Sequence, residues 1–174
     1  MRHIGLLLTM VSLSSVAVAQ PEVEAQRIRC DAASKDWAPV RLPTAGVSAA
    51  IPCNDQELNA YKNANDGRKN TDGLVGCERD GRTYIVMFLV NTPAGFFDQF
   101  NVGSDASPVN NFQVAGHRAS RSAAAKDGET SGNQLVEIDA SRAVLMWSSS
   151  KIANDADFSK VTSCFFNSFE FVPQ

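Results

Sequence analysis

The sequence predicts an α+β fold in which a single antiparallel meander sheet is flanked by helices. Two runs, 82–91 and 143–147, are apolar on both faces of a strand, as expected inside a covered sheet. Asp-Gly pairs, which are typical of hairpin turns, separate the short apolar runs. They stand at 66–67, 72–73, 80–81 and 127–128. A helical pattern at 155–166 supplies the main helix.

The first residues predict a secretory signal at 1–19. Arg2 and His3 form a charged start, apolar residues dominate from Ile4 to Leu13, and Ala17-Val18-Ala19 is typical of a cleavage site. The apolar part is too short to span a bilayer, so we expect no membrane insertion. Because no cysteine follows the cleavage site directly, the predicted product is a soluble exported protein and not a lipoprotein.

Removal of this signal leaves about 155 residues, enough for one domain with a hydrophobic core. We place this domain at 37–174, after a polar lead-in at 20–36. The formal net charge of −3 argues against a nucleic-acid partner, because nucleic-acid binders are normally basic. No pattern indicates a cofactor, and we expect a monomer.

The exported chain retains an even number of cysteines, which predicts disulfide bonds. They are Cys30, Cys53, Cys77 and Cys164, and they allow three pairings. Cys53 follows one expected strand and Cys77 precedes the central one, so we favour Cys53–Cys77, which leaves Cys30–Cys164. A four-cysteine zinc site is the alternative, but such sites usually contain closely spaced cysteine pairs, which this chain lacks.

The amino-terminal half predicts short strands. Prolines at positions 39 and 43 restrict the residues before them to an extended chain, and apolar residues alternate at 47–51. A further strand would place Leu58 and Tyr61 against the core, and its return leads into the central strand. These stretches are expected at 37–43, 47–51, 57–65 and 74–77.

The segment after the central strand predicts a short helix, a loop and a hairpin. Three phenylalanines form an apolar stripe on a helix at 96–100. The stretch 101–111 is rich in Asn, Ser and Asp and is expected to be a loop. A strand at 111–123, a turn at Asp127-Gly128 and a return strand at 134–138 complete the hairpin.

The last helix, at 155–166, has recognisable boundaries. Asn154 or Asp155 is positioned to cap its start, and Asn167 is expected to end it. Its apolar face consists of Phe158, Val161 and Phe165. A strand at 168–172 follows the helix.

Several short motifs follow one another in a characteristic order. A Trp-bearing opening precedes Ile51-Pro52-Cys53, and the central strand begins with Tyr84-Ile85-Val86. A late strand runs from Arg142 to Trp147, and the last helix leads into Asn167-Ser168-Phe169. This order resembles the PsbP-like group of small exported bacterial proteins. The resemblance implies an α/β/α sandwich and a non-enzymatic binding or assembly role without catalytic residues. The signal at 1–19 predicts a periplasmic or secreted location.

Two patterns indicate a periplasmic hydrolase as the alternative function. Ser148 and Lys151 form Ser-x-x-Lys, a nucleophile motif of penicillin-recognising enzymes, but the accompanying Ser-Asp-Asn and Lys-Thr-Gly motifs are absent. His117 is the only histidine after the signal, so a nucleophile–histidine pair would have to use it. We favour a polar strand end for the first pattern and a surface or hydrogen-bonded histidine for the second.

Charged and polar residues offer further candidates. Glu137 and Asp139 face one side of a strand, but acid–base chemistry needs a cleft as well as a pair. The Asn- and Asp-rich stretch 63–72 invites a calcium interpretation, but either alignment of its glycines puts a basic residue at the first ligand position. Arg118 and Arg121 lie on opposite faces of an ideal strand and form no common patch. We expect no metal site.

The loop after the short helix is where we expect a partner to bind. About ten polar residues follow the phenylalanines, and loops of this length in compact domains are often functional. Beside Phe97 and Phe100, this loop would flank a groove between helix and sheet edge. The predicted binding site contains Phe97, Phe100, Ser104 and Asp105, and its partner is an unknown envelope protein or small ligand. For Phe96, Phe97 and Phe100 themselves, packing in the core is favoured over an exposed partner-binding patch.

Overall fold

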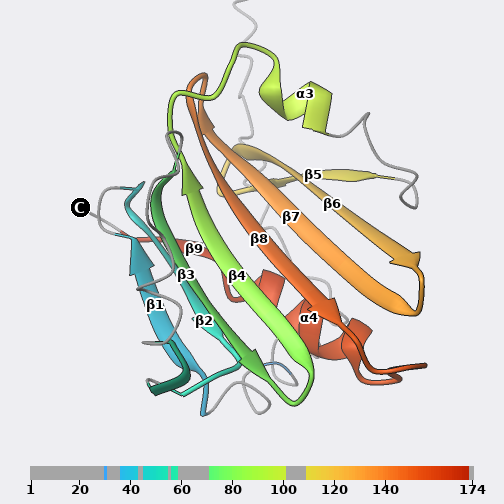
Figure 1. The fold of residues 1–174 in the computed structure, drawn as a ribbon. Coiled ribbons are helices and arrows are strands. Elements are labelled where there is room, and N and C mark those ends of the chain that lie inside the picture. The colour runs from blue at the N-terminus through green and yellow to red at the C-terminus, as the bar shows by residue number, and fades with distance from the viewer. Residues whose placement is uncertain are drawn as a thin grey trace, which may run out of the picture.

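The structure, a computed structural model, describes residues 30, 36–42, 45–54, 56–58, 71–100 and 109–172. The strands in these residues form one sheet of three strands and one of six (Figure 1). The strands are β1 (Ala38–Leu42), β2 (Val47–Ile51), β3 (Thr71–Arg79), β4 (Arg82–Leu89), β5 (Asn110–Val114), β6 (His117–Lys126), β7 (Glu129–Asp139), β8 (Arg142–Ser150) and β9 (Glu170–Phe171). The helices are α3 (Phe96–Phe100) and α4 (Phe158–Asn167).

The larger sheet has the order β3-β4-β8-β7-β6-β5, and all its pairings are antiparallel. The prediction of two interior strands is confirmed, because β4 lies between β3 and β8, and β8 lies between β4 and β7. The Asp-Gly turns at 80–81 and 127–128 are also confirmed, since both residues of each pair have positive φ. The predicted single meander is wrong, because β1, β2 and β9 form a separate sheet.

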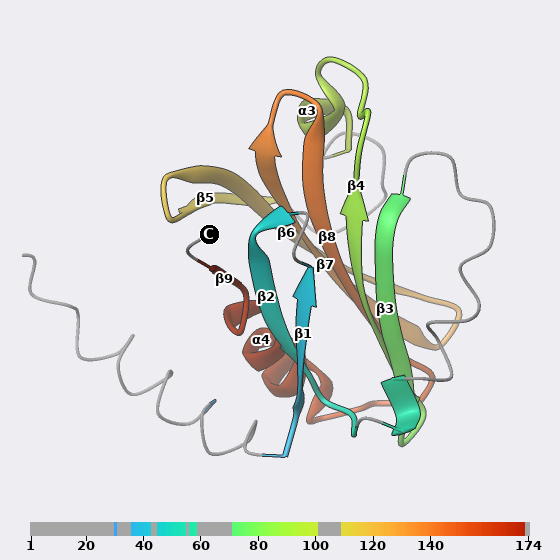
Figure 2. The same cartoon turned by 90° about the vertical axis from the view of Figure 1, so that its left-hand side faces the viewer.

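One face of the six-stranded sheet carries the main core. Tyr84, Val86 and Phe88 of β4 point to this face, which α4 and the three-stranded sheet cover (Figure 2). The ring of Phe165, from α4, meets the ring of Tyr84 edge-on at 5.4 Å between centroids. This cover explains why alternate residues of β4 are buried.

The opposite face of the six-stranded sheet is covered differently. The buried Phe97 of α3 packs with Leu135 and Ala143 at one end of this face. Along the middle of the same face, Met87 and Leu145 are half-buried and pair across β4 and β8. The α+β class is therefore confirmed, but the described residues do not confirm the predicted sandwich with helical layers on both faces.

Two predicted strands differ from the structure. The stretch 111–123 is divided between β5 and β6 by a tight turn at Ala115-Gly116, where both residues have positive φ. Residues 56–58 are helical instead of the start of a strand, although Leu58 is buried as expected. Tyr61 lies outside the described residues.

Asp72-Gly73 is part of β3 and not a turn. The register between β3 and β4 shifts between Thr71 and Gly73, so this pair lies at a bulge. Pairing with β4 along the whole of β3 outweighs the local turn preference of the dipeptide. The Asp-Gly pair at 66–67 lies outside the described residues.

The last helix begins later than predicted. Its N-cap is Asp157, which makes no side-chain capping bond, and its first helical residue is Phe158. Asp155 lies before the helix, where its carboxylate accepts the backbone N–H of Asp157 at 3.2 Å and also binds Arg82 and Ser150. The predicted end at Asn167 is confirmed.

Both predicted disulfide bonds are present. Cys53–Cys77 ties the end of β2 to β3, and Cys30–Cys164 ties the amino-terminal segment to α4. The predicted signal at 1–19 lies outside the described residues. Within the described part of the chain, no helix has the length and apolar character needed to cross a membrane.

Candidate ligand clefts beside the last helix

Two clefts lie on different sides of α4. The first, here called the Arg121 cleft, has a volume of about 310 Å³ and lies between α4 and the β6–β7 hairpin. The second, here called the Tyr84 cleft, has a volume of about 250 Å³ and lies where the β3–β4 turn approaches Trp37 and Val161. Clefts with apolar walls and a few converging polar groups are the usual places for small ligands.

Two rows of side chains from α4 form one wall of the Arg121 cleft. Residues four apart lie on the same face of a helix, so the periodicity of α4 generates both rows. The apolar row is Phe158, Thr162 and Phe166, and the hydroxyl row is Ser159 and Ser163. Asn167 continues the hydroxyl row by the same spacing.

Gly132 of β7 allows α4 to approach the floor of this cleft. A Cβ atom at this position would lie 3.2 Å from Thr162 Cγ2 and 3.5 Å from the ring of Phe166. A Cβ atom here would therefore require the Thr162 side chain to move slightly. The glycine therefore permits close contact between the two walls.

Arg121 occupies the end of the cleft and is held by two amides. Its Nε donates to Gln134 Oε1 at 2.6 Å, and its Nη2 donates to Asn167 Oδ1 at 2.6 Å. Gln134 is fully buried, and its own amide nitrogen donates to the carbonyl of Phe166, which turns the amide oxygen toward Arg121. The guanidinium also lies 4.9 Å from the ring centroid of Phe112.

No carboxylate in the described part of the chain forms an ion pair with Arg121. Its neighbour on the other face of β6, Arg118, pairs with Asp98 and with Glu137, the latter at 3.3 Å. Burial lowers the pKa of Arg121, because the surroundings do not compensate its positive charge. Nη1 of Arg121 donates no hydrogen bond within the described residues, so the site has both a charge and donors to offer an anion.

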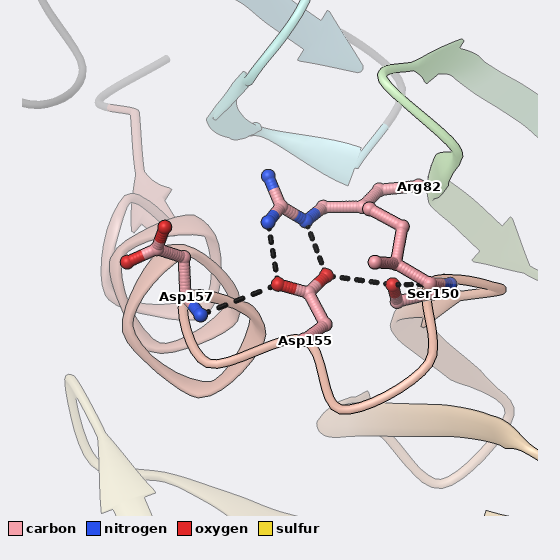
Figure 3. A network of polar contacts seen from close by, with 5 residues as sticks. Arg82, Ser150, Asp155 and Asp157 are labelled. Carbon is pink, nitrogen blue, oxygen red and sulfur yellow. Dashed lines mark hydrogen bonds and ion pairs between the residues drawn. The ribbon is translucent and has the colours of Figure 1, made fainter.

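An ion pair beside the Tyr84 cleft joins β4 to the segment before α4. Arg82 donates from Nε and Nη2 to the two carboxylate oxygens of Asp155, at 2.6 and 2.5 Å, and Ser150 Oγ donates to the same carboxylate at 2.6 Å (Figure 3). The Asp155 side chain is only 4% exposed. These hydrogen bonds, with the Arg82 bonds foremost, hold the pKa of Asp155 well below its ordinary value.

Replacing Asp155 with asparagine should lower the free energy of unfolding at neutral pH by about 1.5–3 kcal/mol, because Arg82 loses a charged partner. A carboxylate with a lowered pKa stabilises the fold fully above its unfolded pKa, near 4, and this stability is lost as the pH falls toward the folded pKa. Urea unfolding from pH 7 to pH 2 measures both effects. The difference between wild type and variant should shrink below pH 4, and a constant difference would contradict the assignment.

The structure places only part of the predicted binding site. Phe97 is buried beneath the guanidinium of Arg118, whose carbon lies 4.4 Å from the ring centroid. Phe100 is half-buried beside Phe96. Ser104 and Asp105 lie outside the described residues, so the site formed with the 101–110 loop stays a prediction.

The residues of the alternative hydrolase lie in different environments. Ser148 is fully buried, and its hydroxyl shares a hydrogen bond of 3.0 Å with Thr162. Lys151 follows β8 and is exposed. His117 stacks on the ring of Phe171 at 4.3 Å between centroids. A nucleophile must be reached by its substrate, and the burial of Ser148 argues against that role.

The predicted pair of Glu137 and Asp139 is not a pair in the structure. The register of β7 shifts between them, and each carboxylate contacts a different arginine. Glu137 lies 3.3 Å from Arg118, and Asp139 lies 2.6 Å from Arg142. The bulge removes the strict alternation on which the prediction depended.

Comparisons with known proteins supply no family. No protein-family model matches the chain, and no curated protein matches it significantly. Among solved structures, the Ran-binding protein Mog1p of Saccharomyces cerevisiae aligns over 78% of this chain and 95% of its own, with a TM-score of 0.46 and 9% identity. A mutant of protein Mog1 aligns over 79% of this chain and 97% of its own, with a TM-score of 0.47 and 8% identity. Likeness at this level carries no argument about function, and the PsbP-like resemblance stays a prediction.

Proposed function

We propose that this chain is a non-catalytic binding module of the bacterial envelope that holds a small anionic ligand with an apolar body in the Arg121 cleft. The observation that carries the proposal is a half-buried guanidinium that lacks a carboxylate partner in the described residues and lies in a cleft with phenylalanine walls. A buried charge is costly unless it is paired, and a bound anion would supply the partner. Export is supported by the two disulfide bonds, which persist in oxidising compartments.

The composition of the cleft favours a monocarboxylate over an inorganic anion. Phe158, Phe166 and Ala123 offer apolar surface, while Ser159 and Ser163 line the same space with hydroxyl groups. A carboxylate can accept hydrogen bonds from Nη1 of Arg121, which Gln134 and Asn167 leave unbound, and an aliphatic tail displaces water from the phenylalanines. Short fatty acids combine both features and are the appropriate probes.

Replacing Arg121 with glutamine should weaken octanoate binding about tenfold or more, because a hydrogen bond to a charged group contributes about 1.5–3 kcal/mol. Titration calorimetry with octanoate and with 1-octanol measures the effect, and the alcohol should bind weakly to both proteins. The matched control is Arg118→Gln, on the opposite face of the same strand, which should bind octanoate like the wild type. Equal binding by wild type and Arg121→Gln would overturn the proposal.

The same variant distinguishes a binding residue from a structural one. Without ligand, Arg121→Gln should melt close to the wild-type temperature, because removal of a charge that no described carboxylate compensates offsets the loss of the hydrogen bonds to Gln134 and Asn167. Octanoate should raise the melting temperature of the wild type and not that of the variant. A variant that melts well below the wild type without ligand would assign Arg121 a structural role.

A further inference from the structure

We propose that the Tyr84 cleft is a second, independent binding site for a neutral polyhydroxylated molecule about the size of one sugar ring. Four segments form it: Trp37 before β1, Pro52 after β2, the β3–β4 turn with the start of β4, and Val161 of α4. Its location and chemistry differ from those of the Arg121 cleft, so this site does not depend on the function proposed above.

The cleft is pre-formed by the covalent framework of the fold. Pro52 is adjacent to Cys53, and Cys77 is paired with Tyr84 across β3 and β4. The Cys53–Cys77 bond therefore fixes the wall at Pro52 against the strand that carries Tyr84. Pre-organisation lowers the entropy lost on binding.

Tyr84 presents a polar group that the described residues leave without a partner. The residue is only 2% exposed, its side chain lines the cleft, and its hydroxyl makes no hydrogen bond with any described residue. Among the described residues, Ser120 Oγ is the buried side-chain polar atom without a hydrogen-bond partner, so the Tyr84 hydroxyl is not enclosed and can be reached from the cleft. Burial raises the pKa of Tyr84 to about 12, so the group is a neutral phenol that both donates and accepts.

Arg82 supplies hydrogen-bond donors in fixed directions, and the positive charge of its guanidinium is already compensated by Asp155. Nε and Nη2 are bound to Asp155, which fixes the guanidinium plane, while Nη1 has no bond among the described residues. The guanidinium therefore offers hydrogen bonds to the cleft without demanding an anion. A ligand oxygen beside Nη1 and the Tyr84 hydroxyl would satisfy both groups.

The charges around the cleft favour a neutral ligand. Its lining contains Arg79 and Arg82 together with Asp36 and Asp80, and Asp155 lies behind Arg82. An anion would face the two carboxylates of the lining, and a cation would face its two guanidinium groups. A mixture of donors and acceptors beside the indole of Trp37 matches a ring that has hydroxyl groups at its edge and C–H groups on its faces.

The test compares three molecules of one shape and different charge: glucose, glucuronate and glucosamine. The readout is the nuclear magnetic resonance signal of the Trp37 indole N–H, observed in a Trp147→Phe background so that one indole remains. Glucose should shift this signal at millimolar concentration, and both charged analogues should bind about tenfold more weakly. No shift with glucose, or tighter binding of either charged analogue, would overturn the proposal.

Tyr84→Phe removes only the hydroxyl and keeps the ring in the core. It should weaken glucose binding about 2- to 10-fold, as expected for one neutral hydrogen bond, and leave octanoate binding unchanged. Arg121→Gln is the reciprocal control and should leave glucose binding unchanged. Glucose binding that is lost in Arg121→Gln but retained in Tyr84→Phe would overturn the proposal and place the sugar in the Arg121 cleft.

Discussion

Replacing Phe88 with alanine should lower the free energy of unfolding by about 3–5 kcal/mol. Phe88 is 1% exposed, lies in β4, and packs on the face that α4 and the three-stranded sheet cover. It is flanked by Gly73 of β3 and Val144 of β8, whose hydrogen-bonded strands cannot close the space that the ring leaves. Urea unfolding followed by circular dichroism measures the loss.

Leu145→Ala is the matched control on the opposite face of the same sheet. Leu145 pairs with Met87, is half-buried, and packs with the α3 cluster at one edge only. Its truncation should cost about 1–2 kcal/mol, because its side chain buries less apolar surface. Both runs, 82–91 and 143–147, are apolar on both faces, and this pattern alone predicts similar costs for both residues. Equal losses would contradict the conclusion that the main core lies on one face.

Elements whose own residues determine their conformation could be predicted from the sequence. The alternation at 47–51 and the apolar run at 82–91 specify strands directly, and Asp80-Gly81 specifies the turn between β3 and β4. The three-phenylalanine stripe likewise specifies α3. In each case, the residues that form the sequence pattern are the same neighbouring residues that form the element.

The errors arise where distant parts of the chain compete with local preference. Asp155 accepts the N–H of Asp157 in front of the helix, but its carboxylate also binds Arg82, 73 residues away in the sequence, and the first helical residue is Phe158. The turn at Ala115-Gly116 could not be predicted, because it has no Asp-Gly pair. Alanine rarely adopts the positive φ that Ala115 has here. The pairing of β4 with β8 joins strands that are far apart in the sequence, so no local pattern predicts it.

The same distinction applies to the candidate sites. Strand alternation correctly separates Arg118 from Arg121, so one arginine had to point inward. That Arg121 meets Asn167, 46 residues later, and lacks a described carboxylate partner follows only from the packing of α4 on the sheet. The Tyr84 cleft likewise combines four separate segments, and no local pattern contains it.

Removing the Cys30–Cys164 bond should destabilise the protein more than removing Cys53–Cys77. In the chain-entropy model, a cross-link stabilises the fold by restricting the unfolded chain, and the effect grows with the number of residues enclosed. The separations are 134 and 24 residues. The model gives losses of about 5 kcal/mol for the first bond and about 3.5 kcal/mol for the second.

The comparison uses two double variants, each with both cysteines of one bond replaced by alanine. Alanine is preferable to serine, because these positions are buried and a serine hydroxyl would lack a partner. Urea unfolding measures the free energy of unfolding that each variant loses. The wild type, when it is unfolded in the presence of a reductant, should be less stable than either variant. The contradicting result is a Cys30/Cys164 variant that loses no more stability than the Cys53/Cys77 variant. That result would show that the long loop closed by the Cys30–Cys164 bond does not restrict the unfolded chain as the chain-entropy model predicts. The stabilisation would then come mainly from packing of Cys53 and Cys77 in the core, where both are fully buried.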